Sequence, residues 1–190
     1  MAMIHLEPQT LEMFSRALDG LKPPPNLSLS QWADKYRKLS AEASASQGQW
    51  NTDAAPFQRE IMDAIGDVHV RKVVAMMCAQ AGKTEGLILN TIGFYMSYHP
   101  ASIMVMQPTV NLGESFSKDR LTPMLRDTPA LRGLVNTKSR YSGNTISKKN
   151  FPGGMLVIVG ANAPTDLRSR PIKVLLADEI DRLLKEETGL

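Results

Sequence analysis

The chain contains a single cysteine among its 190 residues. One cysteine cannot form an internal disulfide, and no group of Cys and His residues has the spacing of a zinc site. The longest apolar runs, around Val73–Ala79 and Met155–Val159, are far too short to cross a bilayer. The segment Met1–Pro8 lacks the basic-then-apolar pattern of a signal peptide. We therefore expect a soluble, unexported protein of a reducing compartment such as the cytoplasm.

A large excess of one charge is also lacking, since the formal net charge is only +3. The distribution is uneven, however. The stretch Lys118–Lys149 holds eight basic residues against two acidic ones, and acidic residues predominate from Asp178 onward. This pattern is typical of a surface that handles phosphate groups, and an ordinary solvated face is the alternative. The length and the 43% hydrophobic content suit one domain with a real core.

Residues 1–55 are predicted to form a helical arm and linker outside any sheet. Apolar spacing over Leu6–Leu21 predicts a helix, and a second, short helix is expected over Gln31–Arg37 with Ser30 as its N-cap. A third helix is predicted over Phe57–Ile65, where a proline opens the first turn.

From about residue 70, short apolar runs alternate with helical patterns. Strands are predicted at Val73–Met77, Ile103–Gln107, Met155–Val159 and Val174–Ala177, with an edge strand at Thr145–Ser147. Helices are predicted over Glu85–Tyr98, Asn111–Leu125 and Pro129–Val135. Continuous apolar strands alternating with helices indicate an α/β fold with a mostly parallel sheet covered by helices on both faces.

The segment between the first predicted strand and its helix has the features of a phosphate-binding loop. Its residues are Ala79, Gln80, Ala81, Gly82, Lys83, Thr84 and Glu85. Backbone N–H groups at a helix N-terminus favour anions, a lysine reaches terminal phosphates, and a hydroxyl holds Mg²⁺. Gly82, Lys83 and Thr84 match the second half of that pattern, but Met77 stands where the first glycine is expected. A chance Gly-Lys-Thr is the alternative for this motif alone.

A pair of carboxylates, Asp178 and Glu179, ends the last predicted strand. Acidic groups at the end of a buried strand are costly unless they have a role there. In phosphate-loop ATPases the first acid holds Mg²⁺ and the next orients or activates the attacking water. An acidic first turn of a helix is the alternative, but both motifs occur in the required order. Together they predict an ATPase.

Three further side chains are candidates for contacts with the nucleotide. Arg168 and Arg170 precede the acidic strand, where a guanidinium can reach a γ-phosphate of its own or a neighbouring subunit, or simply lie in a surface turn. Gln58, upstream of the phosphate loop, can hydrogen-bond adenine or be an ordinary exposed helix residue.

The chain resembles the large terminase subunit of tailed bacteriophages, the ATP-driven DNA-packaging motor, and its lambda-type branch in particular. The resemblance covers most of residues 30–181, in order. The matching blocks are Trp32-Ala33-Asp34, Gly48-Gln49-Trp50, Pro56-Phe57-Gln58-Arg59-Glu60-Ile61-Met62, Ala79–Glu85, Gln107-Pro108-Thr109, Asp127-Thr128-Pro129-Ala130-Leu131, Gly160-Ala161-Asn162, Leu167-Arg168-Ser169-Arg170-Pro171 and Asp178-Glu179-Ile180-Asp181.

The resemblance implies a P-loop ATPase domain of the additional-strand type, related to RecA and helicases, that uses ATP and Mg²⁺. By the same resemblance, Lys83 contacts the β- and γ-phosphates, Thr84 and Asp178 bind Mg²⁺, and Glu179 is the catalytic carboxylate. The segment with Gln58 lies near adenine. The implied partners are double-stranded DNA, the small terminase subunit, the portal protein of the procapsid and further copies in a ring, in the host bacterial cytoplasm.

Three departures from the family pattern change these expectations. Many terminases carry an arginine in the phosphate loop where this chain has Ala79, so Arg168 or Arg170 becomes the candidate arginine finger. The stretch Ala43–Gln47 lacks the aromatic that lambda-type proteins use against adenine. The chain also stops at Leu190, so we expect residues 56–190 to be a truncated ATPase domain without the coupling strand and the nuclease domain.

Three other functions remain open from the sequence. One is a helicase-like, DNA-dependent ATPase, because Asp178-Glu179-Ile180-Asp181 resembles helicase patterns. Another is a module that binds nucleotide, DNA or the small subunit without turnover. A metabolic P-loop kinase is the weakest, because neither a lid nor an acceptor site is visible.

Overall fold

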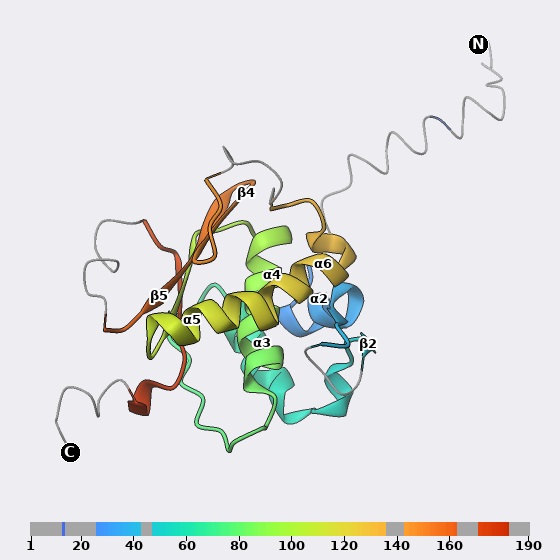
Figure 1. The fold of residues 1–190 in the computed structure, drawn as a ribbon. Helices are drawn as coiled ribbons and strands as arrows, with labels where there is room; N and C mark the ends of the chain where they lie inside the picture. Colours follow the sequence, from blue (N-terminus) through green and yellow to red (C-terminus); the bar gives the residue numbers. More distant parts are fainter. Residues whose placement is uncertain (1–12, 14–25, 43–46, 136–142, 163–170, 183–190) are drawn as a thin grey trace, which may run out of the picture.

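The computed structural model describes residues 13, 26–42, 47–135, 143–162 and 171–182. A four-stranded sheet packs against helices, in the strand order β4-β5-β3-β6 (Figure 1). The strands are β3 (Ile103–Gln107), β4 (Lys148–Phe151), β5 (Gly154–Gly160) and β6 (Val174–Ala177). β3 runs parallel to both β5 and β6, and β4 is antiparallel to β5. The predicted α/β architecture with a mostly parallel sheet is confirmed.

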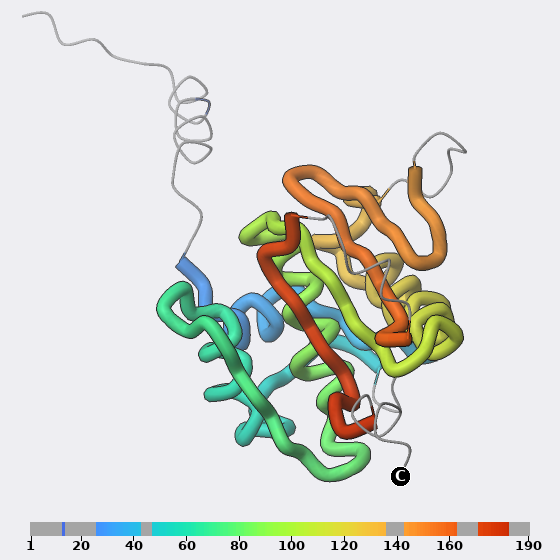
Figure 2. The backbone as a smooth tube through the Cα atoms, turned by 90° about the vertical axis from the view of Figure 1, so that its left-hand side faces the viewer, coloured from blue at the N-terminus to red at the C-terminus, as the bar shows by residue number. Residues whose placement is uncertain are grey.

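The two faces of the sheet carry unequal apolar clusters. Ile103, Val105, Leu156 and Ile158 point to the main core, which the described helices share. The intervening residues, such as Met104, belong to a small cluster on the other face. Figure 2 shows the strands in front and the helices coloured blue to green behind them. In the described part of the chain, the helical cover that we expected on both faces is therefore concentrated on one.

The N-terminal helix of the described part, α2 (Leu29–Tyr36), begins two residues before the predicted position. Its N-cap is Ser28, whose side chain accepts from the N–H of Gln31 while the Gln31 side chain accepts from the N–H of Ser28. Such a reciprocal capping box satisfies two helix donors at once. The prediction of Ser30 as the cap is wrong, because Ser30 is the second residue of the helix, where its N–H donates to Asp63 on another helix.

Several side chains that precede residue 55 belong to the main core. Trp32 of α2 is 1% exposed, and its ring packs where Gly93 leaves room for it. Trp50 is also buried, just before the short helix η1 (Thr52–Ala54). β1 (Lys38–Leu39) pairs with β2 (Gly48–Gln49) in a small separate sheet. The predicted boundary at residue 55 stays a prediction, and most of the helix predicted over Leu6–Leu21 lies outside the described residues.

Two of the predicted long helices contain π-helical turns. The first consists of η2 (Thr84–Leu89) followed by α4 (Asn90–Ser97). The second consists of α5 (Val110–Phe116), η3 (Ser117–Leu121) and α6 (Thr122–Asp127), and the short η4 (Pro129–Leu131) follows. Helix α3 (Phe57–Gly66) agrees with its prediction. Single π-turns are frequent at functional sites, and η2 here begins at the predicted phosphate loop.

Two predicted strands are wrong. Val73–Met77 is extended but pairs with no strand of the described residues, and Met76 in it is 99% exposed. An apolar run favours an extended backbone, but only a neighbouring strand supplies the hydrogen bonds of a ladder. Thr145–Ser147 also forms no strand, and the edge strand β4 begins at Lys148 instead. Among the described residues, no helix combines the length and apolar character that crossing a membrane requires.

Candidate active site at the phosphate loop

The carboxyl ends of the parallel strands bring two polar side chains together. The register pairs Met106 of β3 with Ala177 of β6, and the next residue, Asp178, donates its N–H to the Met106 carbonyl at 3.0 Å. Gln107, the last residue of β3, donates from Nε2 to Oδ2 of Asp178 at 3.3 Å. Open α/β sheets bind ligands at the carboxyl ends of their strands. The sheet therefore places Asp178 where a ligand is expected.

The predicted phosphate loop turns sharply before η2 begins. Gln80 and Gly82 both have left-handed backbone, with φ of 59° and 76°. Glycine adopts this conformation at no steric cost, but for glutamine it is uncommon. Successive N–H groups in such turns form concavities that bind anions. The helix follows at once, since the N–H of Gly86 donates to the Gly82 carbonyl at 2.8 Å.

The structure joins the two sequence motifs through Lys83. Its Nζ lies 3.0 Å from Oδ1 of Asp178 and 4.0 Å from Oε1 of Glu179. The Lys83 side chain is 39% exposed, whereas that of Asp178 is 11% exposed. An ammonium beside Asp178 shows that this carboxylate is placed to accept a cation. The roles of the three residues in catalysis stay predictions.

Glu179 has an unusual backbone conformation directly after the strand. Its φ is 51°, in the left-handed region that a residue with a Cβ rarely adopts. Its Oε2 lies 3.1 Å from Nη1 of Arg182 in the turn that follows. Left-handed residues other than glycine cluster at active sites, where the surrounding structure holds them in place.

Glu85, whose place in the nucleotide-binding loop stays a prediction, faces two arginines. Its Oε2 lies 2.6 Å from Nη2 of Arg37, and its Oε1 lies 3.6 Å from Nη1 of Arg120. The Arg37 side chain is only 1% exposed. Burial raises the pKa of the Glu85 carboxyl, and the two guanidinium groups partly oppose this rise. The pair ties the start of η2 to the end of α2.

Gln58, on α3, contacts the loop directly. It is 1% exposed, and its Nε2 donates to the Ala81 carbonyl at 2.7 Å. The alternative reading of an exposed helix glutamine is therefore wrong. Its predicted contact with adenine stays a prediction, and its hydrogen-bond partner in the structure is the loop.

Arg168 and Arg170 lie outside the described residues. Within the described part, no three His, Cys, Asp or Glu residues cluster as metal ligands. A Mg²⁺ ion usually takes one or two carboxylates, with substrate phosphates and water completing its shell. Asp178, beside a cation already, and Thr84, at the start of η2, fit that chemistry.

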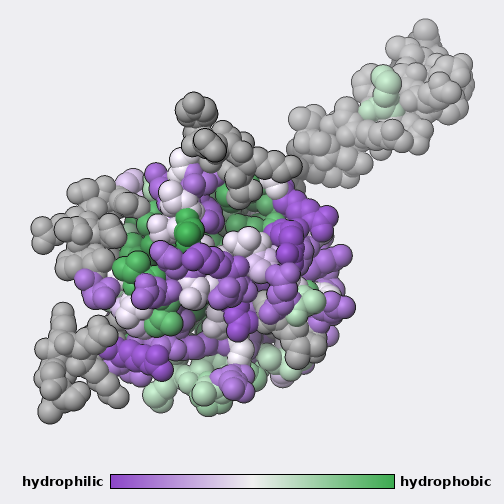
Figure 3. Space-filling view, in the orientation of Figure 1, coloured by the Kyte–Doolittle hydropathy of each residue, from purple (hydrophilic) through white to green (hydrophobic). Residues whose placement is uncertain are grey.

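The basic stretch of the sequence is not a continuous free basic face. Lys149 is buried and donates to the carbonyls of Thr145 and Ile146, and burial lowers its pKa. Arg126 pairs with Glu42 and with Asp127. Lys138 and Arg140 lie outside the described residues. Figure 3 still shows a mainly hydrophilic surface over α5 and α6, which accords with a solvated face.

Two residues of the site, Gln107 and Arg37, were assigned no role from the sequence. Gln107 belongs to a block that resembles the family, but its bond to Asp178 depends on the β3–β6 register. No sequence pattern predicts that Arg37 is buried, because arginine is almost never fully buried unless it is paired. Its burial could have been inferred only from knowing that it pairs with Glu85.

Comparison with known proteins identifies the family. The family model described as "Phage terminase large subunit gpA, ATPase domain" matches residues 44–189. The chain is 30% identical over 159 residues to the terminase large subunit of Enterobacteria phage P21, covering 83% of this chain and 24% of that protein. It is 29% identical over 173 residues to the terminase large subunit of Escherichia phage lambda, covering 90% of this chain and 26% of that protein.

The chain thus spans about a quarter of the length of these curated relatives. No solved structure matches. The family model covers most of the chain and includes both the phosphate loop and the acidic pair. The chain belongs to the family of ATPase domains of phage terminase large subunits.

Proposed function

We propose that this chain binds ATP with Mg²⁺ and hydrolyses it as the ATPase of a packaging motor that moves double-stranded DNA into procapsids. The observation that carries the proposal is the 3.0 Å contact between Lys83 and Asp178, which joins the two motifs at the carboxyl ends of parallel strands. The family membership supports the same activity. We infer a P-loop fold of the additional-strand type from the family membership, although the strand expected before the phosphate loop does not form in the described residues.

Each residue has a defined task in this proposal. The loop N–H groups and Lys83 bind the β- and γ-phosphates, so the Lys83 ammonium exchanges Asp178 for a phosphate oxygen. Thr84 and Asp178 hold Mg²⁺, which neutralises charge on the phosphates when bound. Glu179 orients and activates the attacking water. Arg168 or Arg170 supplies the guanidinium that the phosphate loop lacks at Ala79.

The wider assembly is proposed by resemblance to the relatives named as terminase large subunits. It comprises a ring of such subunits around DNA, in contact with the small terminase subunit and the portal protein, in the host bacterial cytoplasm. Contacts with DNA would run mainly through phosphates and would weaken with salt. Strand separation by the same chain would favour the helicase-like alternative.

The test is steady-state ATP hydrolysis in Mg²⁺, with and without duplex DNA, for the wild type and Glu179→Gln. We expect the variant to lose about a hundredfold or more in turnover, because a positioned general base contributes about that much, and to keep ATP binding. Asp181→Asn is the matched control, since Asp181 is an exposed carboxylate in the same turn. Wild-type turnover by Glu179→Gln would remove Glu179 from catalysis.

A further inference from the structure

The side-chain amide of Gln58 is buried and packs against the phosphate loop. Its Nε2 donates to the Ala81 carbonyl at 2.7 Å, which fixes the orientation of the amide. Ala81 stands between Gln80 and Gly82, the two residues with left-handed backbone. The Gln58 side chain therefore holds the Ala81 carbonyl, which lies between the two left-handed residues of the loop.

Two glycines of the loop and its helix leave room for this amide. A Cβ on Gly82 would lie 3.0 Å from Nε2 of Gln58, and a Cβ on Gly86 would lie 1.8 Å from its Oε1. The second distance is far inside van der Waals contact, so any side chain at position 86 must displace Gln58. Oε1 itself is buried and has no hydrogen-bond partner among the residues that the structure describes. The close fit exists only with glycine at position 86.

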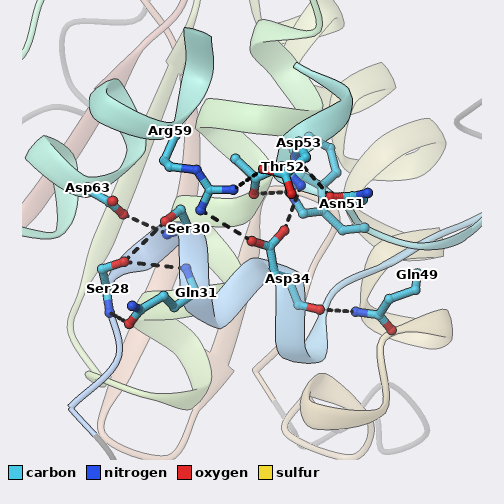
Figure 4. Close-up of polar contacts among 11 residues, drawn as sticks. Ser28, Ser30, Gln31, Asp34, Gln49, Asn51, Thr52, Asp53, Arg59 and Asp63 are labelled. Atoms are coloured by element: carbon cyan, nitrogen blue, oxygen red, sulfur yellow. Dashed lines mark hydrogen bonds and ion pairs between the residues drawn. The ribbon is translucent and has the colours of Figure 1, made fainter. Parts of the chain in front are cut away.

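The helix that carries Gln58 is itself anchored on the N-terminal segment (Figure 4). Arg59 pairs with Asp53 at 2.6 Å and with Asp34 at 3.6 Å. Asp63 accepts from the N–H of Ser30 at 3.0 Å. Both α3 residues follow Gln58 in the sequence, and their partners lie on α2 and η1, so these contacts hold the Gln58 helix against two other segments.

We propose that Gln58 is a positioning residue that holds the phosphate loop in its anion-binding shape through the Ala81 carbonyl and does not select the nucleotide base. The proposal deepens the proposed function, on which its effect on nucleotide binding rests. It requires Gln58 to act equally on every ligand that carries a triphosphate.

The first experiment follows hydrogen exchange in the free chain, without nucleotide. Gln58→Ala should raise the exchange of the amides in residues 82–90 about tenfold, among them that of Gly86, which bonds to Gly82 in the intact loop. Gln49→Ala is the matched control, since Gln49 also donates from Nε2 to a backbone carbonyl, that of Asp34, at 2.8 Å but in an exposed place. Unchanged exchange in Gln58→Ala would overturn the proposal.

The second experiment compares the binding of ATP, GTP and inorganic triphosphate. Loss of one hydrogen bond to the loop should weaken all three by about fivefold in Gln58→Ala. Weakening of ATP alone would overturn the proposal in favour of an adenine contact. If the wild type binds none of the three while loop exchange still rises in the variant, the proposed function fails and the positioning role stands.

A double-mutant cycle tests the contact itself. Gly86→Ala should weaken triphosphate binding and loosen the loop in the wild-type background, because its Cβ meets Gln58. In the Gln58→Ala background the space is open, so the same change should have little further effect. Equal effects of Gly86→Ala in both backgrounds would contradict the proposed contact between position 86 and the Gln58 side chain.

Discussion

Gly93 decides how closely the N-terminal helix packs on the helix that follows the phosphate loop. A Cβ at this position of α4 would lie 2.3 Å from Cη2 of Trp32 and 3.0 Å from its Cζ3. Trp32 cannot move away easily, because it is 1% exposed and its Nε1 donates to Oγ of Ser97 at 3.1 Å. Its ring also meets that of Phe94 edge to face.

Two opposing effects set the stability of Gly93→Ala. Alanine in a helix interior is favoured over glycine by about 1 kcal/mol. Extra volume in a packed core costs about 1–3 kcal/mol, and the clash with the Trp32 ring lies well inside contact distance. The 2.3 Å approach calls for the upper part of that cost, about 2–3 kcal/mol. We therefore expect a net loss of about 1–2 kcal/mol in the free energy of unfolding, measured by urea denaturation at an unchanged m-value.

The control repeats Gly93→Ala in a Trp32→Phe background. Phenylalanine lacks the atoms nearest the new methyl group, so alanine at position 93 should there be neutral or stabilising. A Gly93→Ala variant that is more stable than the wild type, with Trp32 intact, would refute the packing argument. It would show that helix propensity alone governs the position.

Two further predictions concern Glu85 and Ser28. Burial raises the folded-state pKa of Glu85 above its ordinary 4.5, so its contribution to stability is complete below that pH and is lost as pH rises through the folded pKa. Glu85→Gln should reduce this loss of stability, measured as the fall in melting temperature between about pH 4 and pH 7. The same fall in the variant and the wild type would show that another group causes it. Ser28→Ala removes the side-chain acceptor of the capping box with Gln31, so it should lower the free energy of unfolding by about 1 kcal/mol, and Ser30→Ala should not remove that cap.

The strands show which part of the fold is readable from sequence. Ile103–Gln107 and Val174–Ala177 were predicted with the bounds that they have, because a continuous apolar run favours a buried parallel strand. Val73–Met77 is a similarly continuous apolar run, but it has no neighbouring strand in the described residues to pair with. An apolar composition therefore predicts an extended backbone. Whether the segment joins a sheet depends on a neighbouring strand from another part of the chain.

The π-turns were beyond prediction for a different reason. η2 and η3 continue helices whose apolar spacing is ordinary, and their altered hydrogen bonds appear only in the folded backbone. The position of α2 was mispredicted because Ser30 was chosen by residue type alone. The spacing favours Ser28, since Gln31 stands three residues after it and completes a capping box, whereas Ala33 stands three residues after Ser30.

The candidate site was predictable where a motif sits at the end of a strand. Lys83 and Asp178 were both identified, and the sheet brings them into contact. Gln107 and Arg37 were missed because their partners come from distant parts of the chain. Gln58 was singled out, but its burial against the loop depends on how α3 packs.

The binding of Mg·ATP at Lys83 is the most direct test of this account. Calorimetric titration of the wild type and Lys83→Ala should show saturable, Mg²⁺-dependent binding to the wild type and a strong loss in the variant. The reason is that Lys83 is the cation of the loop that reaches both the acidic pair and, as proposed, the terminal phosphates. Equal binding by the two proteins, or none by the wild type, would contradict the assignment of residues 79–84 as the nucleotide site.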